Sequence, residues 1–128
     1  MSSILLEDSI FKKLQFNKDW IDIGIIDQKS FIKIKEKYLE ENDNSSEHYR
    51  WLAFINFLKN NKNISGELLH KIYFLGKKEP DYAMGSSMRF KIIKHINCPV
   101  ELINIAIQDK DRGLSKEALK LKKRDRHS

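Results

Sequence analysis

The sequence predicts an all-α protein, built as an irregular stack of antiparallel helical hairpins with about six to seven helices. Two observations predict this class. Apolar residues recur every three to four positions along almost the whole 128-residue chain, which is the spacing of helices. Residues 20–26 alone are dense in β-branched side chains, and no second strand candidate is available to pair with them. With five Gly and two Pro, the chain is not a low-complexity linker. We therefore expect one small α-helical domain over residues 1–128.

The N-terminal part, residues 1–45, is expected to form a divergent helical hairpin. Its first helix is predicted by apolar residues spaced three to four apart between Ile4 and Leu14. Residues 20–26 then form either a short strand or a packed connector, and the lack of a partner strand favours the connector. Asp27 is a suitable N-cap for the next helix, which ends at a polar turn over residues 42–46.

The middle of the chain, residues 46–76, is expected to form the first of two repeat-like hairpins. A helix over 46–60 has apolar residues around most of its circumference, including Trp51 and Phe54, and is expected at the centre of the fold. Ser65 is predicted to cap the following helix, and Gly76 to end it. Residues 77–87 would then be the longest loop.

The second repeat-like hairpin is expected over residues 88–109. Its first helix, 88–96, would present Met88, Ile92 and Ile96 to the core. Pro99 suits the start of the next helix, because proline lacks the N–H that a first helical turn leaves unbonded. A basic helix and tail over 112–128 would end the chain.

One internal repeat is visible in the second half of the chain. Residues 63–69 (NISGELL) align with residues 97–103 (NCPVELI), 34 positions further on. Periods of about this length are typical of stacked helical hairpins, in which each unit buries its apolar face against its neighbours.

Residues 89–109 resemble one unit of the HEAT-like variant leucine-rich repeat family. The similarity lies in Arg89, an apolar pair, a histidine, the small Cys98 before Pro99, a later Leu and Ala, and the closing Asp109. The resemblance is partial over residues 50–118. It implies a curved helical stack, a fragment of an α-solenoid, which has no catalytic residues and holds another macromolecule. Such stacks also occur in some bacterial immunity and adaptor proteins.

The sequence offers little support for catalysis or metal binding. The four histidines are scattered, and the single cysteine, Cys98, has no partner at zinc spacing. Cys98 and His95 lie within one turn, but a small residue before a helix-starting proline explains Cys98. We therefore expect no enzyme activity, no cofactor, no metal and no small-molecule substrate.

Charge indicates where a partner would bind. The formal net charge is +6, and six basic against two acidic residues place +4 of it in residues 116–128. Trp, Tyr and Arg are the residue types that most often anchor protein interfaces. The residues predicted to bind a partner are Trp20, Tyr49, Arg50, Tyr82, Arg89, Lys91, Lys94, His95, Lys120, Lys123 and Arg124.

The combined pattern favours a non-enzymatic protein-binding module, such as a small bacterial immunity, inhibitor or adaptor protein that binds one toxin or effector. The alternative is nucleic-acid binding through the basic C-terminal helix. Apolar runs of at most five residues exclude a membrane span, and the N-terminus lacks a secretory signal pattern. A lone cysteine fits a reducing compartment, so a cytoplasmic location is expected.

Overall fold

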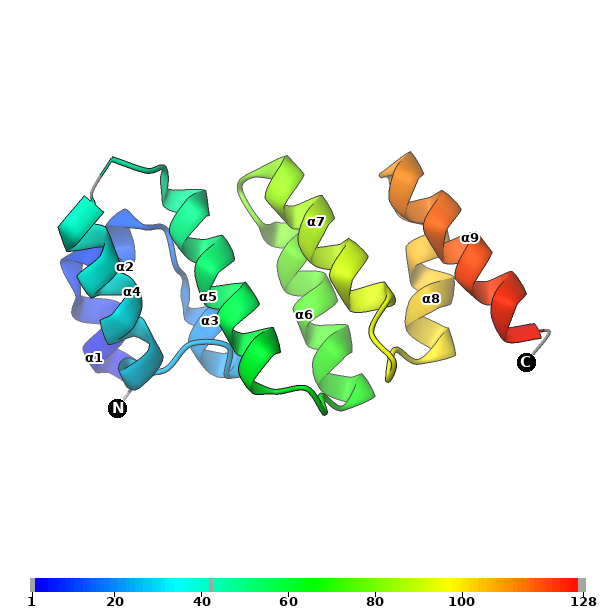
Figure 1. Cartoon of the computed structure of the whole chain (residues 1–128), viewed down its shortest axis with the longest axis horizontal. Helices are drawn as coiled ribbons and strands as arrows, with labels where there is room; N and C mark the ends of the chain where they lie inside the picture. The colour runs from blue at the N-terminus through cyan, green and yellow to red at the C-terminus, as the bar shows by residue number, and fades with distance from the viewer. Residues whose placement is uncertain (1, 42, 127–128) are drawn as a thin grey trace. The chain divides into compact units, whose positions relative to one another are not determined.

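The computed structural model describes the backbone of residues 2–41 and 43–126 and the side chains of residues 4–41 and 43–124. These residues form nine helices and no strand (Figure 1). The predicted all-α class is confirmed, whereas the predicted count of six to seven helices is wrong, because the N-terminal part contains more, shorter helices than expected. The chain divides into two compact units, Met1–Lys62 and Asn63–Ser128, so the two helices of the predicted 46–76 hairpin belong to different units.

The first unit contains three short helices followed by two long ones. These are α1 (Ser2–Glu7), α2 (Ser9–Lys13), α3 (Lys18–Ile23), α4 (Gln28–Glu41) and α5 (Ser46–Asn60). Residues 20–26 are the end of α3 and a buried connector, so the strand alternative is wrong. Gly24 ends α3 with φ of 91°, a left-handed conformation that glycine adopts without strain. Asp27 caps the start of α4 as predicted, accepting a hydrogen bond from the Ser30 N–H at 2.7 Å.

Aromatic side chains fill the core of the first unit. The Phe11 ring lies 5.3 Å from that of Phe31, and the Phe16 ring lies 5.1 Å from that of Trp20, both pairs edge to face. Helix α5 adds Phe54, which is fully buried. Trp51, predicted to lie in the core with Phe54, is only half-buried.

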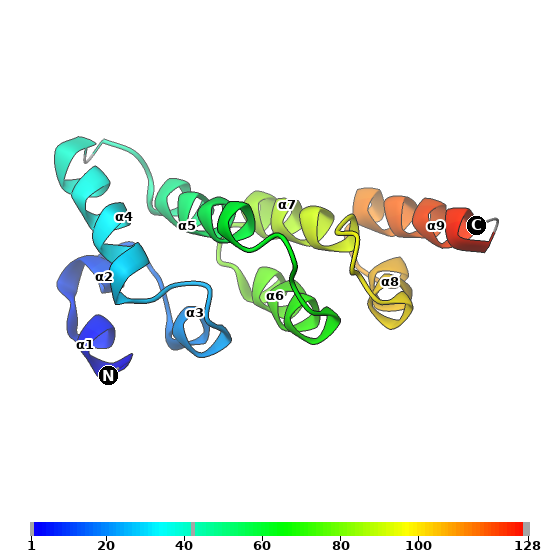
Figure 2. The same ribbon diagram turned by 60° about the horizontal axis from the view of Figure 1, so that its bottom comes forward.

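The second unit consists of two antiparallel helical hairpins. The first pairs α6 (Gly66–Lys78) with α7 (Tyr82–Ile93), and the second pairs α8 (Val100–Ile107) with α9 (Arg112–Arg126). The helices expected to pair as a hairpin over residues 88–109, α7 and α8, therefore belong to different hairpins. Within this unit, α6 and α8 form one layer and α7 and α9 the other (Figure 2). Ser65 caps α6 as predicted, accepting from the Leu68 N–H at 3.1 Å. Residues 127–128 of the predicted basic tail lie outside the described residues.

The predicted long loop over 77–87 is wrong, because only residues 79–81 separate α6 from α7. Gly76 and Gly85, expected to mark a helix end and a loop, are both inside helices where α6 and α7 meet. A Cβ on Gly85 would lie less than 3.0 Å from the Gly76 carbonyl oxygen, so a larger residue would force the helices apart. Helix α7 therefore starts at Tyr82, with Asp81 as its N-cap.

The two copies of the internal repeat begin next to each other in the second unit. The Asn97 side-chain amide donates to the Ile64 carbonyl at 2.8 Å and to the Asn63 side chain at 3.1 Å. These bonds hold the α7–α8 turn against the segment before α6. In that turn Ile96 is 92% exposed, which contradicts the expectation that it faces the core.

Candidate functional site

The net positive charge of the protein is confined to the second unit. Residues 1–62 contain ten Lys and Arg against ten Asp and Glu, whereas residues 63–128 contain fourteen against eight. The difference in the second unit, fourteen minus eight, equals the +6 of the whole chain. An anionic partner would therefore be attracted to the second unit.

Much of this charge lies along the exposed side of α9. Leu114 and Ala118 are fully buried and define the inner side of the helix. On the opposite side, successive basic residues are four, four and three positions apart and all are exposed: Arg112, Lys116, Lys120 and Lys123. We call these four residues the α9 basic stripe. None of the four takes part in an ion pair among the described residues.

The α9 basic stripe costs the free protein some stability. Like charges at i and i+4 on a helix destabilise it by about 0.2–0.5 kcal/mol per pair. The acidic residue Glu117 of α9 is 4.0 Å from Lys94, the residue after α7, and not from a residue of the stripe. The stripe is thus a surface that an acidic partner would neutralise.

Exposed apolar residues accompany the basic residues of the second unit. Ile96 and Val100 are 92% and 51% exposed, and Leu119 on α9 is 42% exposed. Ile96 projects from a turn that is fixed by hydrogen bonds, since Asn97 N–H donates to His95 Nδ1 at 3.0 Å. This turn and the C-terminal end of α9 lie at the same end of the unit (Figure 1). The exposed apolar turn and the C-terminal end of the α9 basic stripe therefore lie at one end of the unit.

A buried polar network holds the hairpins of the second unit together. The Arg89 guanidinium donates to both Asp109 carboxylate oxygens, at 3.0 and 3.3 Å, and to the Gly76 carbonyl at 3.1 Å. The Tyr73 hydroxyl and the Asp111 N–H also donate to Asp109. Burial by itself would raise the pKa of the Asp109 carboxyl, but these hydrogen bonds outweigh it and hold the pKa below its usual value. Burial and the bond to Asp109 raise the pKa of Tyr73.

Four of the residues predicted to bind a partner are buried, which contradicts their use as exposed anchors. Trp20 is 2% exposed and belongs to the aromatic core, and Tyr49 is fully buried, with its hydroxyl 3.1 Å from Glu41. Arg50 is 1% exposed and donates to the Leu14 carbonyl at 2.8 Å, while Arg89 forms the network above. Both arginines are buried because backbone or carboxylate oxygens satisfy their donors.

The other predicted residues do reach the surface. Tyr82 is 66% exposed, with its hydroxyl 3.3 Å from Asp111. His95 is half-exposed. The remaining five are exposed, and all belong to α7, the residue after it, or α9: Lys91, Lys94, Lys120, Lys123 and Arg124. The structure therefore brings the surviving candidates together on the second unit.

Some exposed residues of the second unit were not among those predicted from the sequence to bind a partner. Arg112 and Lys116 complete the α9 basic stripe, and the i, i+4 spacing of basic residues along α9 was the signal that could have identified them. Ile96, Val100 and Leu119 had no such signal, because apolar residues in a helical pattern are normally expected to be buried.

The described residues contain no group of three or more His, Cys, Asp and Glu side chains that could hold a metal ion. His95 and Cys98 are joined through the backbone, where the Cys98 N–H donates to the His95 carbonyl at 3.0 Å. His95 Nδ1 accepts from Asn97, whereas the half-buried Cys98 thiol lies 3.7 Å from the Pro99 carbonyl.

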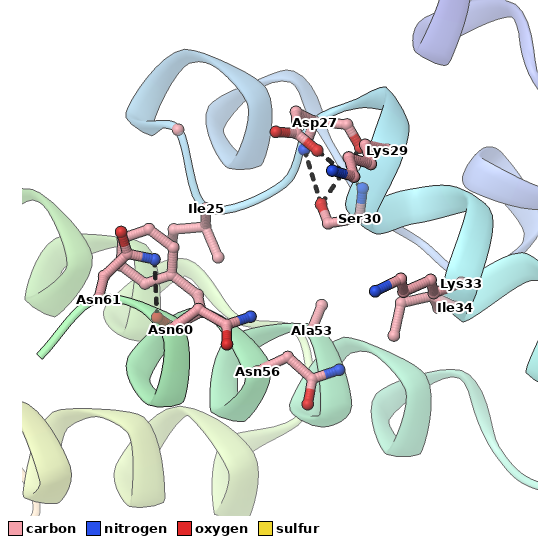
Figure 3. A pocket seen from close by; sticks show the side chains of 12 residues that line it. Ile25, Asp27, Lys29, Ser30, Lys33, Ile34, Ala53, Asn56, Asn60 and Asn61 are labelled. Atoms are coloured by element: carbon pink, nitrogen blue, oxygen red, sulfur yellow. Dashed lines mark hydrogen bonds between the residues drawn. The ribbon is translucent and has the colours of Figure 1, made fainter.

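An open groove of 560 Å³ lies in the first unit, between α4 and α5 (Figure 3). Its floor is apolar, formed by Ile25, Ile34, Ala53 and part of Phe57. Its rim is polar and includes Lys29 and Lys33 from α4 and Asn56, Asn60 and Asn61 from α5 and its end. Sequence analysis missed this groove; the only available signals were the i, i+4 spacings of the Lys and Asn pairs.

Among the described residues, no helix is long and apolar enough to cross a membrane. No family model matches the sequence, and neither a curated protein nor a solved structure matches it significantly.

Proposed function

We propose that this chain is a non-enzymatic helical module that binds a partner protein through the second unit. The observation that carries the proposal is the confinement of the +6 charge to that unit, together with exposed apolar residues at the same end. The partner surface would be acidic around an apolar patch. Such complementarity gives specificity and speeds association.

The apolar component favours a protein over a nucleic acid. Ile96 is held almost fully exposed by a hydrogen-bonded turn, and Val100 is half-exposed at the start of α8. Burying such side chains against a partner gives binding energy, at about 25 cal/mol per Å² of apolar surface. A phosphate backbone offers no apolar pocket for them.

The resemblance of residues 89–109 to a HEAT-like repeat unit supports a more specific form of the proposal. The two hairpins of the second unit pack side by side, as units of a helical stack do. We extend the proposal to a fragment of an α-solenoid that works as an immunity, inhibitor or adaptor protein in the bacterial cytoplasm.

Capture of the partner from a native lysate, followed by binding of the purified pair, tests the proposed function. The variant Lys116→Glu/Lys120→Glu reverses two exposed charges of the α9 basic stripe. The matched control, Lys12→Glu/Lys59→Glu, reverses two exposed charges of the first unit. We expect the α9 variant to lower the affinity by about tenfold or more and the control to leave it nearly unchanged. Equal affinity for both variants would contradict the proposal.

Nucleic-acid binding is the second candidate, favoured by the regular spacing of the α9 basic stripe. Each phosphate that the protein no longer neutralises should reduce the slope of log affinity against log salt by about one. If the captured material is nucleic acid and Lys116→Glu/Lys120→Glu lowers that slope by about two, this alternative replaces the protein partner.

A further inference from the structure

The groove between α4 and α5 combines an apolar floor with a polar rim. Ile25, Ile34 and Ala53 are 4%, 3% and 6% exposed, so they are packed into the unit beneath the groove. The volume of 560 Å³ lies within the range of about 300–1,000 Å³ that is typical of ligand sites. The groove belongs entirely to the first unit, and the α9 basic stripe belongs to the second.

One wall of the groove carries amide groups at a regular spacing. Asn56 and Asn60 are both exposed, lie one helical turn apart on α5 and line the groove (Figure 3). Four helical residues rise about 6 Å. Two residues of an extended chain rise about 6.6 Å. Because a side-chain amide both donates and accepts, this pair matches the N–H and C=O groups of alternate residues in an extended peptide.

A third side-chain amide in the groove, at the end of α5, is already hydrogen-bonded. Asn61 donates to the Phe57 carbonyl at 2.9 Å, so its side chain is fixed at the end of α5. Asn56 and Asn60, by contrast, form no hydrogen bond with described side chains or backbone through their amides. The two amides remain available to a bound chain.

The opposite wall is positively charged. Lys29 and Lys33 are exposed, lie one turn apart on α4, and form no ion pair among the described residues. The one carboxylate in the groove, Asp27, accepts the Ser30 N–H at the start of the helix and also interacts electrostatically with Lys29. The unit as a whole is neutral, with ten basic and ten acidic residues, so this pair is a local excess of positive charge.

We propose that the groove binds an extended acidic segment of a partner protein. Carboxylates two residues apart would face Lys29 and Lys33, the peptide backbone would bond to Asn56 and Asn60, and an apolar side chain between them would rest on the floor. Successive side chains of an extended chain point to opposite sides, which allows this alternation of acidic and apolar residues. This inference rests on the proposed function only in that the partner is a protein, and it uses a separate surface.

Fluorescence anisotropy with the full chain tests the inference. The probe is a fluorescein-labelled seven-residue peptide of alternating Glu and Val, and the control peptide has Gln in place of Glu. We expect the Glu peptide to bind at least about tenfold more tightly than the Gln peptide, with shifts of the Asn56 and Asn60 side-chain amide signals in NMR spectra. Free glutarate should compete only weakly, because it has no peptide backbone.

Variants locate the binding in the groove. Lys29→Glu/Lys33→Glu and Asn56→Ala/Asn60→Ala should each weaken peptide binding by about tenfold. Lys116→Glu/Lys120→Glu, a lysine pair of the same spacing in the second unit, should leave it unchanged. All these side chains are exposed, and circular dichroism verifies that each variant is folded.

Two sets of results would overturn the inference. Equal binding of the Glu and Gln peptides, or loss of binding only in the α9 variant, would show that the groove does not recognise acidic peptides. Glutarate competing as well as the peptide would assign the groove to small carboxylates. Either result leaves the proposed function standing, because that function is tested by partner capture with the α9 variant.

Discussion

The Arg89–Asp109 pair gives the most quantitative prediction for the second unit. The two side chains are 7% and 2% exposed, and Asp109 accepts from Arg89, from the Tyr73 hydroxyl and from the Asp111 N–H. Asp109→Ala would remove both carboxylate oxygens that accept from the guanidinium and leave its hydrogen bond to the Gly76 carbonyl. Breaking a buried ion pair by removing one partner costs about 3–5 kcal/mol.

This loss is a large part of the total for a small protein, since unfolding free energies are about 5–15 kcal/mol. It corresponds to a fall in Tm of about 10–20 °C for a chain of this size. Thermal and urea unfolding followed by circular dichroism measure the change, and amide hydrogen exchange should locate it in α6 to α9. Glu67→Gln, which removes an exposed partner of Lys71, is the control and should cost less than about 0.5 kcal/mol.

A double-mutant cycle tests the physical reason. Arg89→Met removes the buried positive charge, so Asp109→Ala should cost clearly less in that background than in the wild type. The difference should exceed about 1 kcal/mol. A cost below about 1 kcal/mol for Asp109→Ala alone, or an equal cost in both backgrounds, would refute the conclusion that this network holds the two hairpins together.

Three further predictions concern packing and pH. Gly85→Ala should destabilise the protein by about 1–3 kcal/mol, because the new Cβ would lie less than 3.0 Å from the Gly76 carbonyl oxygen. Gly113→Ala should be neutral or stabilising, because the atom nearest to its new Cβ lies at 3.4 Å. The melting temperatures of the two variants check these opposite signs. Phe54→Ala should cost about 3–5 kcal/mol in urea unfolding, since Phe54 is fully buried; a cost below about 1 kcal/mol would mean that the ring is not core. The lowered pKa of Asp109 gives stability that is present above its unfolded value near 3.8 and is lost as the pH falls through the folded value, so urea midpoints at pH 6 and pH 3 should differ more in the wild type than in Asp109→Ala.

Local signals in the sequence predicted the helix boundaries that depend on local chemistry. Asp27 and Ser65 cap α4 and α6 as expected, and α5 spans Ser46–Asn60 as the periodicity indicates. The loop predicted at 77–87 failed for a tertiary reason. Glycine is typical of turns. The close approach of Gly85 to Gly76 shows that this glycine instead allows α6 and α7 to pack closely.

The candidate site was only partly predictable for the same kind of reason. The basic residues of α9 are visible as a charge pattern, and they do lie at the surface. Nothing in the sequence distinguishes Arg50 and Arg89 from the exposed basic residues of α9. Both arginines are buried, and oxygens from distant parts of their own units accept their hydrogen bonds. The groove in the first unit is lined by residues of two helices, among them Lys33 of α4 and Asn60 of α5, and spacing along one helix cannot show that they line one space.

The most direct test of partner binding by the second unit is amide hydrogen exchange on the purified complex with the captured protein. The proposal predicts slowed exchange over residues 94–100 and along α9, with little change in α1 to α3. Binding that leaves α9 and residues 94–100 unprotected would contradict the central claim.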